Sequence, residues 1–95
     1  MEIIHKDNGR NGVFKAMENG MEVGEMTYNW INKETIAINH TGVGMQNEGR
    51  GIGKQMVKKA AEFAREKNLK IVPVCPFVEA LFQRDTNFQD IWGEY

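Results

Sequence analysis

The sequence is poor in cysteine and proline, and it lacks any long apolar run. Its single cysteine, Cys75, cannot form a disulfide within the chain, so it serves either packing or chemistry. No apolar run approaches the roughly 18–20 residues that cross a bilayer. The opening segment, MEIIHKDNGR, has acidic and polar residues where a signal peptide carries a basic end and an apolar block. We therefore expect a cytoplasmic protein with no membrane contact.

The chain also lacks an excess of either charge. It contains 12 basic and 13 acidic residues, a formal net charge of -1, and its isoelectric point is about 6.1. This balance argues against a nucleic-acid partner that is recognised through bulk charge, and no strip of basic and aromatic residues indicates a local patch. The 95 residues contain no repeat and no low-complexity segment. We expect a single domain over residues 1–95, large enough for one modest core.

The first half of the chain has the pattern of β-strands. Gly12 to Glu18 is predicted to be a strand. It ends at Asn19–Gly20, a pair typical of a type I′ hairpin turn, because both central positions of that turn need positive φ. Further strands are expected over Met21 to Ile31 and over Thr35 to Thr41. The opening EIIHKD predicts an additional edge strand.

Two details of the strand pattern concern the direction of side chains. The apolar alternation changes phase within the second hairpin strand, which predicts a β-bulge at Gly24–Glu25. In the following strand, simple alternation places His40 on the same face as Ile36 and Ile38. By pattern alone, a histidine in that position is most simply a packed residue.

The second half of the chain is predicted to be mostly helical. Apolar residues recur at helical spacing from about Gly51 to Lys67, and Asn68 suits a left-handed stop. A strand is expected over Lys70 to Cys75, where Pro73 removes one ladder donor and so predicts an edge or splayed strand. A short helix is expected over Val78 to Gln83. This order of elements predicts an α+β fold with a mainly antiparallel sheet, one long helix after a glycine loop and one short C-terminal helix.

The loop before the long helix carries the strongest functional signal. Glycines at positions 49, 51 and 53 allow main-chain N–H groups to approach a ligand without hindrance from a Cβ atom. The first turn of a helix adds unpaired N–H groups and a partial positive charge, so the segment predicts an anion site, most naturally for phosphate or pyrophosphate. The simpler alternative is a flexible loop that precedes a helix. The basic residues beside the loop recur at steps of four: Arg50, Lys54 and Lys58.

Two common phosphate-binding patterns do not fit this loop. A P-loop would need glycine at Glu48 and serine or threonine at Gln55. A dinucleotide fingerprint that starts at Gly49 ends on Lys54 instead of a third glycine, and the chain lacks the alternating βαβ pattern that surrounds such a site.

A third pattern does match. The segment RGIG, entering an amphipathic helix, resembles the coenzyme A pyrophosphate loop of the GCN5-related N-acetyltransferase superfamily, whose core is Gln/Arg-x-x-Gly-x-Gly/Ala. Three segments carry the resemblance in order, NHTGV at 39–43, EGRGIGKQMVKKAAEFAREKNLK at 48–70 and IVPVCPFV at 71–78. They are most similar to the small, single-domain N-acetyltransferase-like family. Glu48 stands where the superfamily core has Arg or Gln, and Asp85–Thr86 stand where the small family often has His-Pro.

The resemblance implies acetyl-coenzyme A, or coenzyme A itself, as a co-substrate and no metal. It implies that pantetheine lies between two splayed strands, Thr35–Val43 and Lys70–Cys75, and that an amine on a small molecule or peptide accepts the acetyl group. His40 and Cys75 are the implied catalytic residues, and the protein is expected to be a monomer or a weak homodimer. The residues implied to bind the cofactor are Thr41, Val43, Gly49, Arg50, Gly51, Ile52, Gly53, Lys54, Phe77 and Arg84.

Alternatives stay open at this point for the catalytic candidates and for the whole protein. His40 would deprotonate the incoming amine or orient water, whereas Cys75 would accept the acetyl group as a thioester or merely line the pocket. Free cysteine is by itself most simply a buried packing residue. A coenzyme A-binding module without catalysis, serving as a sensor or partner subunit, is the alternative function. The aromatic residues most simply fill the core and its rim: Phe14, Tyr28, Trp30, Phe63, Phe77, Phe82, Phe88, Trp92 and Tyr95.

Overall fold

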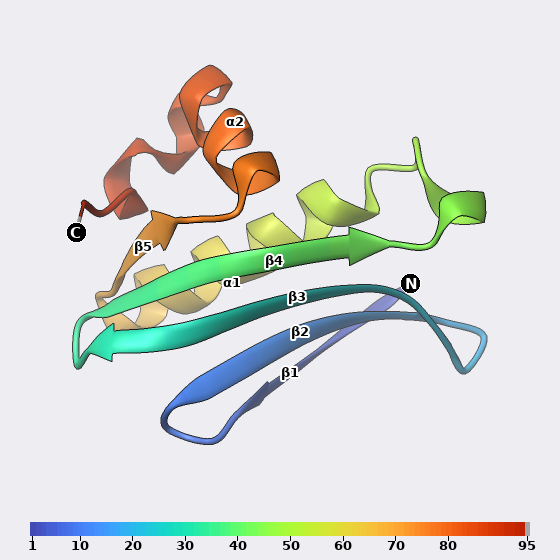
Figure 1. The fold of residues 1–95 in the computed structure, drawn as a ribbon, viewed down its shortest axis with the longest axis horizontal. Helices are drawn as coiled ribbons and strands as arrows, with labels where there is room; N and C mark the ends of the chain where they lie inside the picture. Colours follow the sequence, from blue (N-terminus) through green and yellow to red (C-terminus); the bar gives the residue numbers. More distant parts are fainter. Residues whose placement is uncertain (95) are drawn as a thin grey trace.

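The computed structural model describes residues 1–94, so the final aromatic residue, Tyr95, lies outside the described residues. Over that range, five strands, two α-helices and two 3-10 segments follow one another along the chain (Figure 1). None of these helices has the length and apolar character needed to cross a bilayer. The bounds are β1 Glu2–Asp7, β2 Asn11–Glu18, β3 Met21–Asn32, β4 Thr35–Val43, η1 Met45–Asn47, α1 Ile52–Lys67, β5 Lys70–Pro73, α2 Pro76–Arg84 and η2 Thr86–Ile91.

The strands form one mixed sheet in the order β1-β2-β3-β4-β5. The three pairs from β1 to β4 are antiparallel, while β4 and β5 run parallel and are joined through α1. The turn between β2 and β3 has φ of 49° at Asn19 and 77° at Gly20, as the hairpin prediction requires. The predicted α+β fold with a mainly antiparallel sheet is confirmed, and so is the additional edge strand β1.

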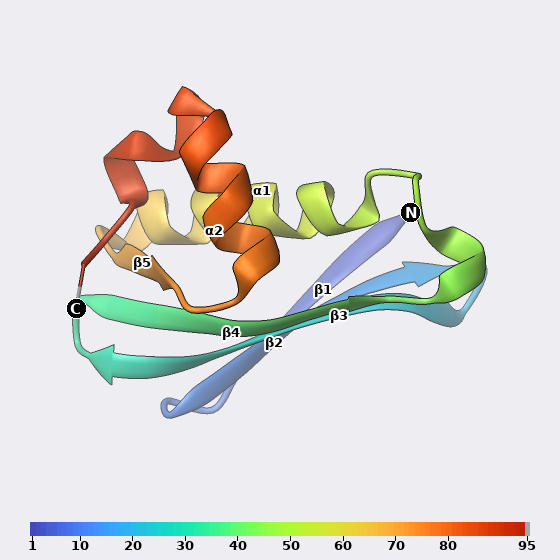
Figure 2. The ribbon, with the colours of Figure 1, turned by 45° about the horizontal axis from the view of Figure 1, so that its top comes forward.

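The helices lie over one face of the sheet and leave the other face open (Figure 2). The face of α1 that carries Ile52, Met56 and Ala60 is buried against the sheet in a single core cluster. Gly24 on β3 makes this approach possible, because a Cβ atom there would lie 3.0 Å from Cγ2 of Ile52. The helix ends where Asn68 adopts a left-handed φ of 56°, as predicted.

Three irregularities in strand pairing correct the expected side-chain directions. The bulge in the second hairpin strand lies at Val23, one residue before the predicted position. A second bulge lies at Asn39, because Ile38 pairs with Tyr28 but His40 pairs with Thr27. The extra residue reverses the alternation, so the expectation that His40 shares a face with Ile36 and Ile38 is wrong. A third shift lies near the end of β3, between residues 30 and 32.

The parting of β4 and β5 shapes one side of the molecule. Their pairing ends at Ile38 opposite Pro73, and one further bond joins the Cys75 N–H to the Ile38 carbonyl at 2.9 Å. The strand that was expected to reach Cys75 therefore stops at Pro73, and α2 begins at Pro76, two residues earlier than predicted, since proline suits the first turn of a helix. Beyond this point β4 continues to Val43 paired with β3 but without a partner on the side of β5, as the prediction of splayed strands requires.

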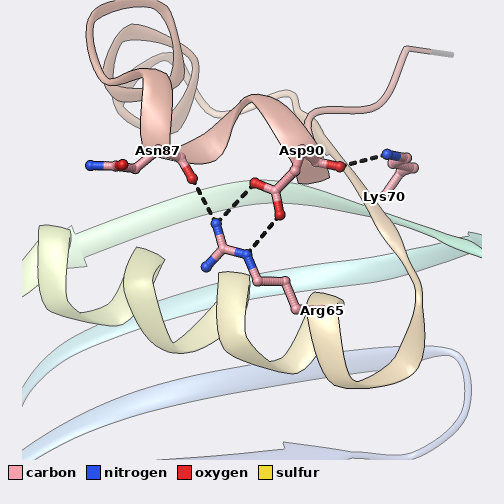
Figure 3. Close-up of polar contacts among 4 residues, drawn as sticks. All are labelled: Arg65, Lys70, Asn87 and Asp90. Atoms are coloured by element: carbon pink, nitrogen blue, oxygen red, sulfur yellow. Dashed lines mark hydrogen bonds and ion pairs between the residues drawn. The ribbon is translucent and has the colours of Figure 1, made fainter.

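The C-terminal segment is fastened to the end of α1, an arrangement that the sequence did not indicate. Arg65 donates from Nε to Asp90 Oδ2 at 2.8 Å and from Nη2 to the Asn87 carbonyl at 2.6 Å (Figure 3). Lys70 Nζ donates to the Asp90 carbonyl. The hydrogen bond from Arg65 holds the pKa of the Asp90 carboxyl below its usual value. This ion pair is exposed, so it adds little free energy by itself, and in the same segment Phe88 stacks on Phe82.

A polar cluster toward the opposite edge of the sheet joins β1 to β3 across β2. The Tyr28 hydroxyl and Trp30 Nε1 both donate to Oδ2 of Asp7, and Tyr28 also bonds His5 Nε2 at 2.7 Å. The Tyr28 ring crosses the position where any side chain on Gly12 would stand. Burial opposes ionisation of Asp7, but the bonds from Tyr28, the Gly9 N–H and Trp30 lower its pKa overall.

We predict that Asp7→Asn lowers the free energy of unfolding by about 1–2 kcal/mol. The carboxylate accepts from Tyr28 and Trp30 through Oδ2 and from the Gly9 N–H through Oδ1, whereas the amide keeps one acceptor oxygen and turns its NH2 group toward a donor. Urea unfolding followed by tryptophan fluorescence measures this, with Glu2→Gln on the same strand as the control. The lowered pKa makes the contribution of Asp7 complete above about pH 4 and progressively lost as the pH falls through the folded-state value. The free energies of unfolding of the wild type and of Asp7→Asn should therefore converge in acid. Equal stability of these two proteins at pH 7 would contradict the account.

Candidate functional site

A cavity of about 470 Å³ opens where β4 parts from the chain after β5. The part of β4 beyond Ile38 forms one wall, and α2 forms another. The glycine loop and the first turn of α1 close one end. Segments far apart in sequence therefore meet at one place. The lining residues are Thr41, Val43, Asn47, Glu48, Gly49, Gly51, Ile52, Gly53, Lys54, Phe77 and Arg84.

The glycine loop presents unpaired main-chain donors to this cavity. Gly49 and Gly51 adopt left-handed φ values of 82° and 76°, and no side chain caps the start of α1. Within residues 1–94, the N–H groups of residues 49 to 54 donate to no protein acceptor, and the first paired N–H is that of Gln55, bonded to the Gly51 carbonyl at 3.0 Å. Successive bare N–H groups at a helix N-terminus attract anions through their dipoles. The loop can therefore hold a phosphate or diphosphate group.

The cavity is apolar beside this anion site. The ring of Phe77 lies against Gly53 so closely that a Cβ atom there would stand 2.9 Å from it. Phe77 is 41% exposed although most aromatic residues of the chain are buried or half-buried, so its ring is available to a ligand. Val43 and Ile52 line the cavity as well. An elongated molecule with an anionic part and an apolar part fits these surroundings.

The charged residues around the loop divide into two groups. Lys54, Arg84 and Glu48 line the cavity, so two positive groups and one negative group face the space. Arg50 does not line it. Its guanidinium group is bound by the carboxylate of Glu18 at the end of β2 and by Oδ1 of Asn47. Of the residues predicted to bind the cofactor, all except Arg50 are brought together at this cavity.

The two predicted catalytic residues lie on different sides of β4. Cys75 is 6% exposed, and its thiol lies 3.5 Å from Oγ1 of Thr41, a residue that lines the cavity. His40 is exposed and faces away from the helices, because the bulge at Asn39 turns it to the open face. Its imidazole there lies above Gly42, with Nε2 3.1 Å from where a Cβ atom would be. The structure therefore brings Cys75 beside the cavity and leaves His40 behind the strand.

Some residues at the cavity were not predicted as site residues. Asn47 lies in η1, whose single turn has no periodic signal in the sequence. Glu48 lines the cavity at the position where the superfamily motif has Arg or Gln, so the motif was the signal that could have identified it as a site residue.

Asp85 stands where the small family often has histidine. It accepts a hydrogen bond from the Asn87 N–H at 3.0 Å and caps η2.

The fold and the cavity define an α+β protein in which a bare helix N-terminus faces a gap between two parting strands. A family model described as GCN5-related N-acetyl-transferase matches residues 13–91. Because the match takes in most of the chain, the protein belongs to the GCN5-related N-acetyltransferase family, as the resemblance of its motifs predicted.

Curated relatives of known sequence include Protein NATD1 from several vertebrates. The Xenopus tropicalis protein is 33% identical over 54 residues, which cover 57% of this chain and 50% of that protein. The Danio rerio protein is 28% identical over 64 residues, which cover 67% of this chain and 58% of that protein. The chain thus spans about half the length of the curated relatives it matches.

Solved structures share the fold more completely. A GCN5-like protein from Staphylococcus aureus is 32% identical, with a TM-score of 0.71 over 97% of this chain and 89% of that chain. A ribosomal-protein-alanine N-acetyltransferase from Brucella melitensis is 19% identical, with a TM-score of 0.70 over 93% and 69% of the two chains. A family member from Elizabethkingia anophelis with acetyl-CoA bound is 22% identical, with a TM-score of 0.66 over 79% and 52%. The last two show the likeness of fold alone.

We predict that Gly51→Ala lowers the free energy of unfolding by about 1 kcal/mol, because alanine is strained at the left-handed φ of 76° although open space surrounds the position. Gly44→Ala is the control in the same connection, since Gly44 has φ of -56° and its nearest neighbour would lie 3.5 Å from the new Cβ. Chemical denaturation compares the two variants. Equal effects at both positions would show that the left-handed turn is not required.

Proposed function

We propose that the protein transfers an acetyl group from acetyl-coenzyme A to an amine on a small molecule or peptide. The observation that carries the proposal is the row of unpaired N–H groups at residues 49 to 54, which opens into the same cavity as the free edge of β4. Membership of the acetyltransferase family supports the same activity. Acetyl-coenzyme A joins a diphosphate to an extended arm that ends in a thioester, and the cavity has a feature suited to each part.

The diphosphate would bind at the glycine loop, with Lys54 adding a positive charge. The pantetheine arm carries amide groups, and the part of β4 after Ile38 lacks a strand partner on the side of β5. That edge therefore offers main-chain donors and acceptors to the arm, as one strand does to another. Phe77 would pack against its apolar portion. This arrangement would direct the thioester toward Thr41 and Cys75.

In the proposed reaction the amine nitrogen attacks the thioester carbonyl, and the bond from carbon to sulfur breaks as the thiolate of coenzyme A leaves. One proton must leave the amine, and the thiolate takes up one proton. Main-chain N–H groups near Val43 would stabilise the oxygen that becomes negative in the transition state. His40 lies on the open face of β4, so it would accept a proton from an amine, or from a water, that arrives on that side.

A coenzyme A-binding module without catalysis is the second candidate. Two observations favour it. Glu48 places a negative charge at the cavity, and His40 does not line the cavity that would hold the thioester. The two candidates agree on binding and differ only in turnover, so a panel of amine acceptors separates them.

We predict that coenzyme A and acetyl-coenzyme A bind and raise the melting temperature, and that ATP does so much less, because ATP lacks the pantetheine arm. Lys54→Gln should weaken coenzyme A binding about tenfold through loss of one charged phosphate contact. Lys58→Gln removes the same charge one turn later on α1, outside the cavity lining, and should have little effect. Titration calorimetry measures the affinities. Equal stabilisation by ATP would reduce the site to one for phosphate in general.

We further predict direct transfer without an acetylated enzyme. The thiol of Cys75 is buried, and Cys75 does not line the cavity, so it is poorly placed to attack the thioester. Incubation with acetyl-coenzyme A alone should leave the intact mass unchanged, and Cys75→Ser should keep most of the transfer activity. A protein heavier by one acetyl group, with the adduct absent in Cys75→Ser, would establish the covalent route instead. In that route the acetyl group moves from the coenzyme sulfur to Sγ, and the thiol proton passes to the leaving thiolate.

A further inference from the structure

Arg50, in the middle of the glycine loop, is turned away from the cavity and fastened to the sheet. Its Nη1 donates to Oε1 of Glu18 at 3.0 Å and to Oδ1 of Asn47 at 2.7 Å, and its Nη2 donates to Oε2 of Glu18. Glu18 is the last residue of β2, beside the Asn19–Gly20 turn. A two-pronged contact of this kind fixes the orientation of both side chains more firmly than a single ion pair does.

Little else holds this part of the loop. The turn before it is closed by bonds from the Gly44 N–H to Val23 and from the Asn47 N–H to Gly44, at 3.2 and 2.8 Å. From residue 48 to residue 51, the Arg50–Glu18 contact is the one hydrogen bond or ion pair to a strand within residues 1–94. A Cβ atom added to Gly49 or to Gly51 would have no other part of the protein within 4 Å, apart from the adjacent residues. Glycines without neighbours leave a loop free to sample many backbone conformations.

The contact also reaches the wall of the cavity. Asn47 lines the cavity, and its side-chain oxygen is occupied by Arg50. Arg50 thus connects a residue at the end of β2 to a residue that faces the ligand space. Its own positive charge is balanced by the Glu18 carboxylate, so Arg50 serves the loop by position and leaves Lys54 and Arg84 as the cationic groups at the cavity.

We propose that Glu18 is a positioning residue for the anion site: through Arg50 and Asn47 it holds the glycine loop in the shape that presents the N–H groups of residues 49 to 54 to a diphosphate. The inference rests on the proposed function, because it requires the loop to bind the diphosphate of coenzyme A. A preorganised loop binds more tightly, since less conformational freedom is lost when the ligand arrives. Glu18 lies outside the cavity lining, and the sequence gives it no site motif.

The test compares Glu18→Gln with Glu22→Gln by calorimetry and by chemical-shift titration. Glu22 forms an exposed ion pair with Lys15 at 3.4 Å in the same hairpin but does not touch the loop, so it is the matched control. Glu18→Gln should weaken coenzyme A binding about fivefold, and Glu22→Gln should leave it unchanged. Pantetheine, which lacks the diphosphate, should bind both variants and the wild type equally. A merely structural defect would weaken both ligands together and lower the melting temperature.

A charge exchange gives a second test of the same contact. Arg50→Glu alone should weaken coenzyme A binding, and the double variant Glu18→Arg with Arg50→Glu should recover part of the affinity by restoring the pair in reverse. Unchanged or tighter coenzyme A binding in Glu18→Gln overturns the proposal, and tighter binding would mean that Glu18 withholds Arg50 from the ligand. Failure of the wild type to bind coenzyme A overturns this proposal and the proposed function together, whereas wild-type binding with an unaffected Glu18→Gln overturns this proposal alone.

Discussion

The proposed function depends on one feature of the structure, the run of main-chain N–H groups from residue 49 to residue 54 that find no acceptor in the described part of the protein. Left-handed glycines create this run, and the absence of a side-chain cap on α1 preserves it. Unpaired donors cost free energy where water is excluded, so they persist where solvent or a ligand satisfies them. Their place beside the gap between β4 and β5 makes the start of α1 the proposed binding site for an anion.

The rest of the fold brings a second surface to this site. Pairing between β4 and β5 ends at Ile38 and Pro73, so the remaining part of β4 borders the cavity with an unpartnered edge. The bulge at Asn39 then divides the side chains of that strand, with Thr41 directed toward the cavity and His40 toward the open face. One strand therefore separates the cavity, the proposed space for the coenzyme, from the open face that carries His40.

Local features of the sequence predicted most of the fold and most of the residues that line the candidate site. Asn19–Gly20 and Asn68 determine their own backbone conformations, and the apolar spacing in α1 determines its buried face, so these predictions succeeded. The prediction that His40 shares a face with Ile36 and Ile38 failed because the bulge at Asn39 depends on the register with β3, which no local pattern encodes. The contact between Arg50 and Glu18 was not foreseen for the same reason, since 32 residues separate the partners along the chain.

The central claim is that the bare N–H groups at the start of α1 hold the diphosphate of coenzyme A. The most direct test is an amide chemical-shift titration of isotope-labelled protein with coenzyme A, since each N–H in question gives its own signal. The account predicts that the largest shifts fall on residues 49 to 54, with smaller shifts along the free edge of β4. Shifts centred on the open face around Thr27 and Asn39, or no saturable shifts at all, would contradict it.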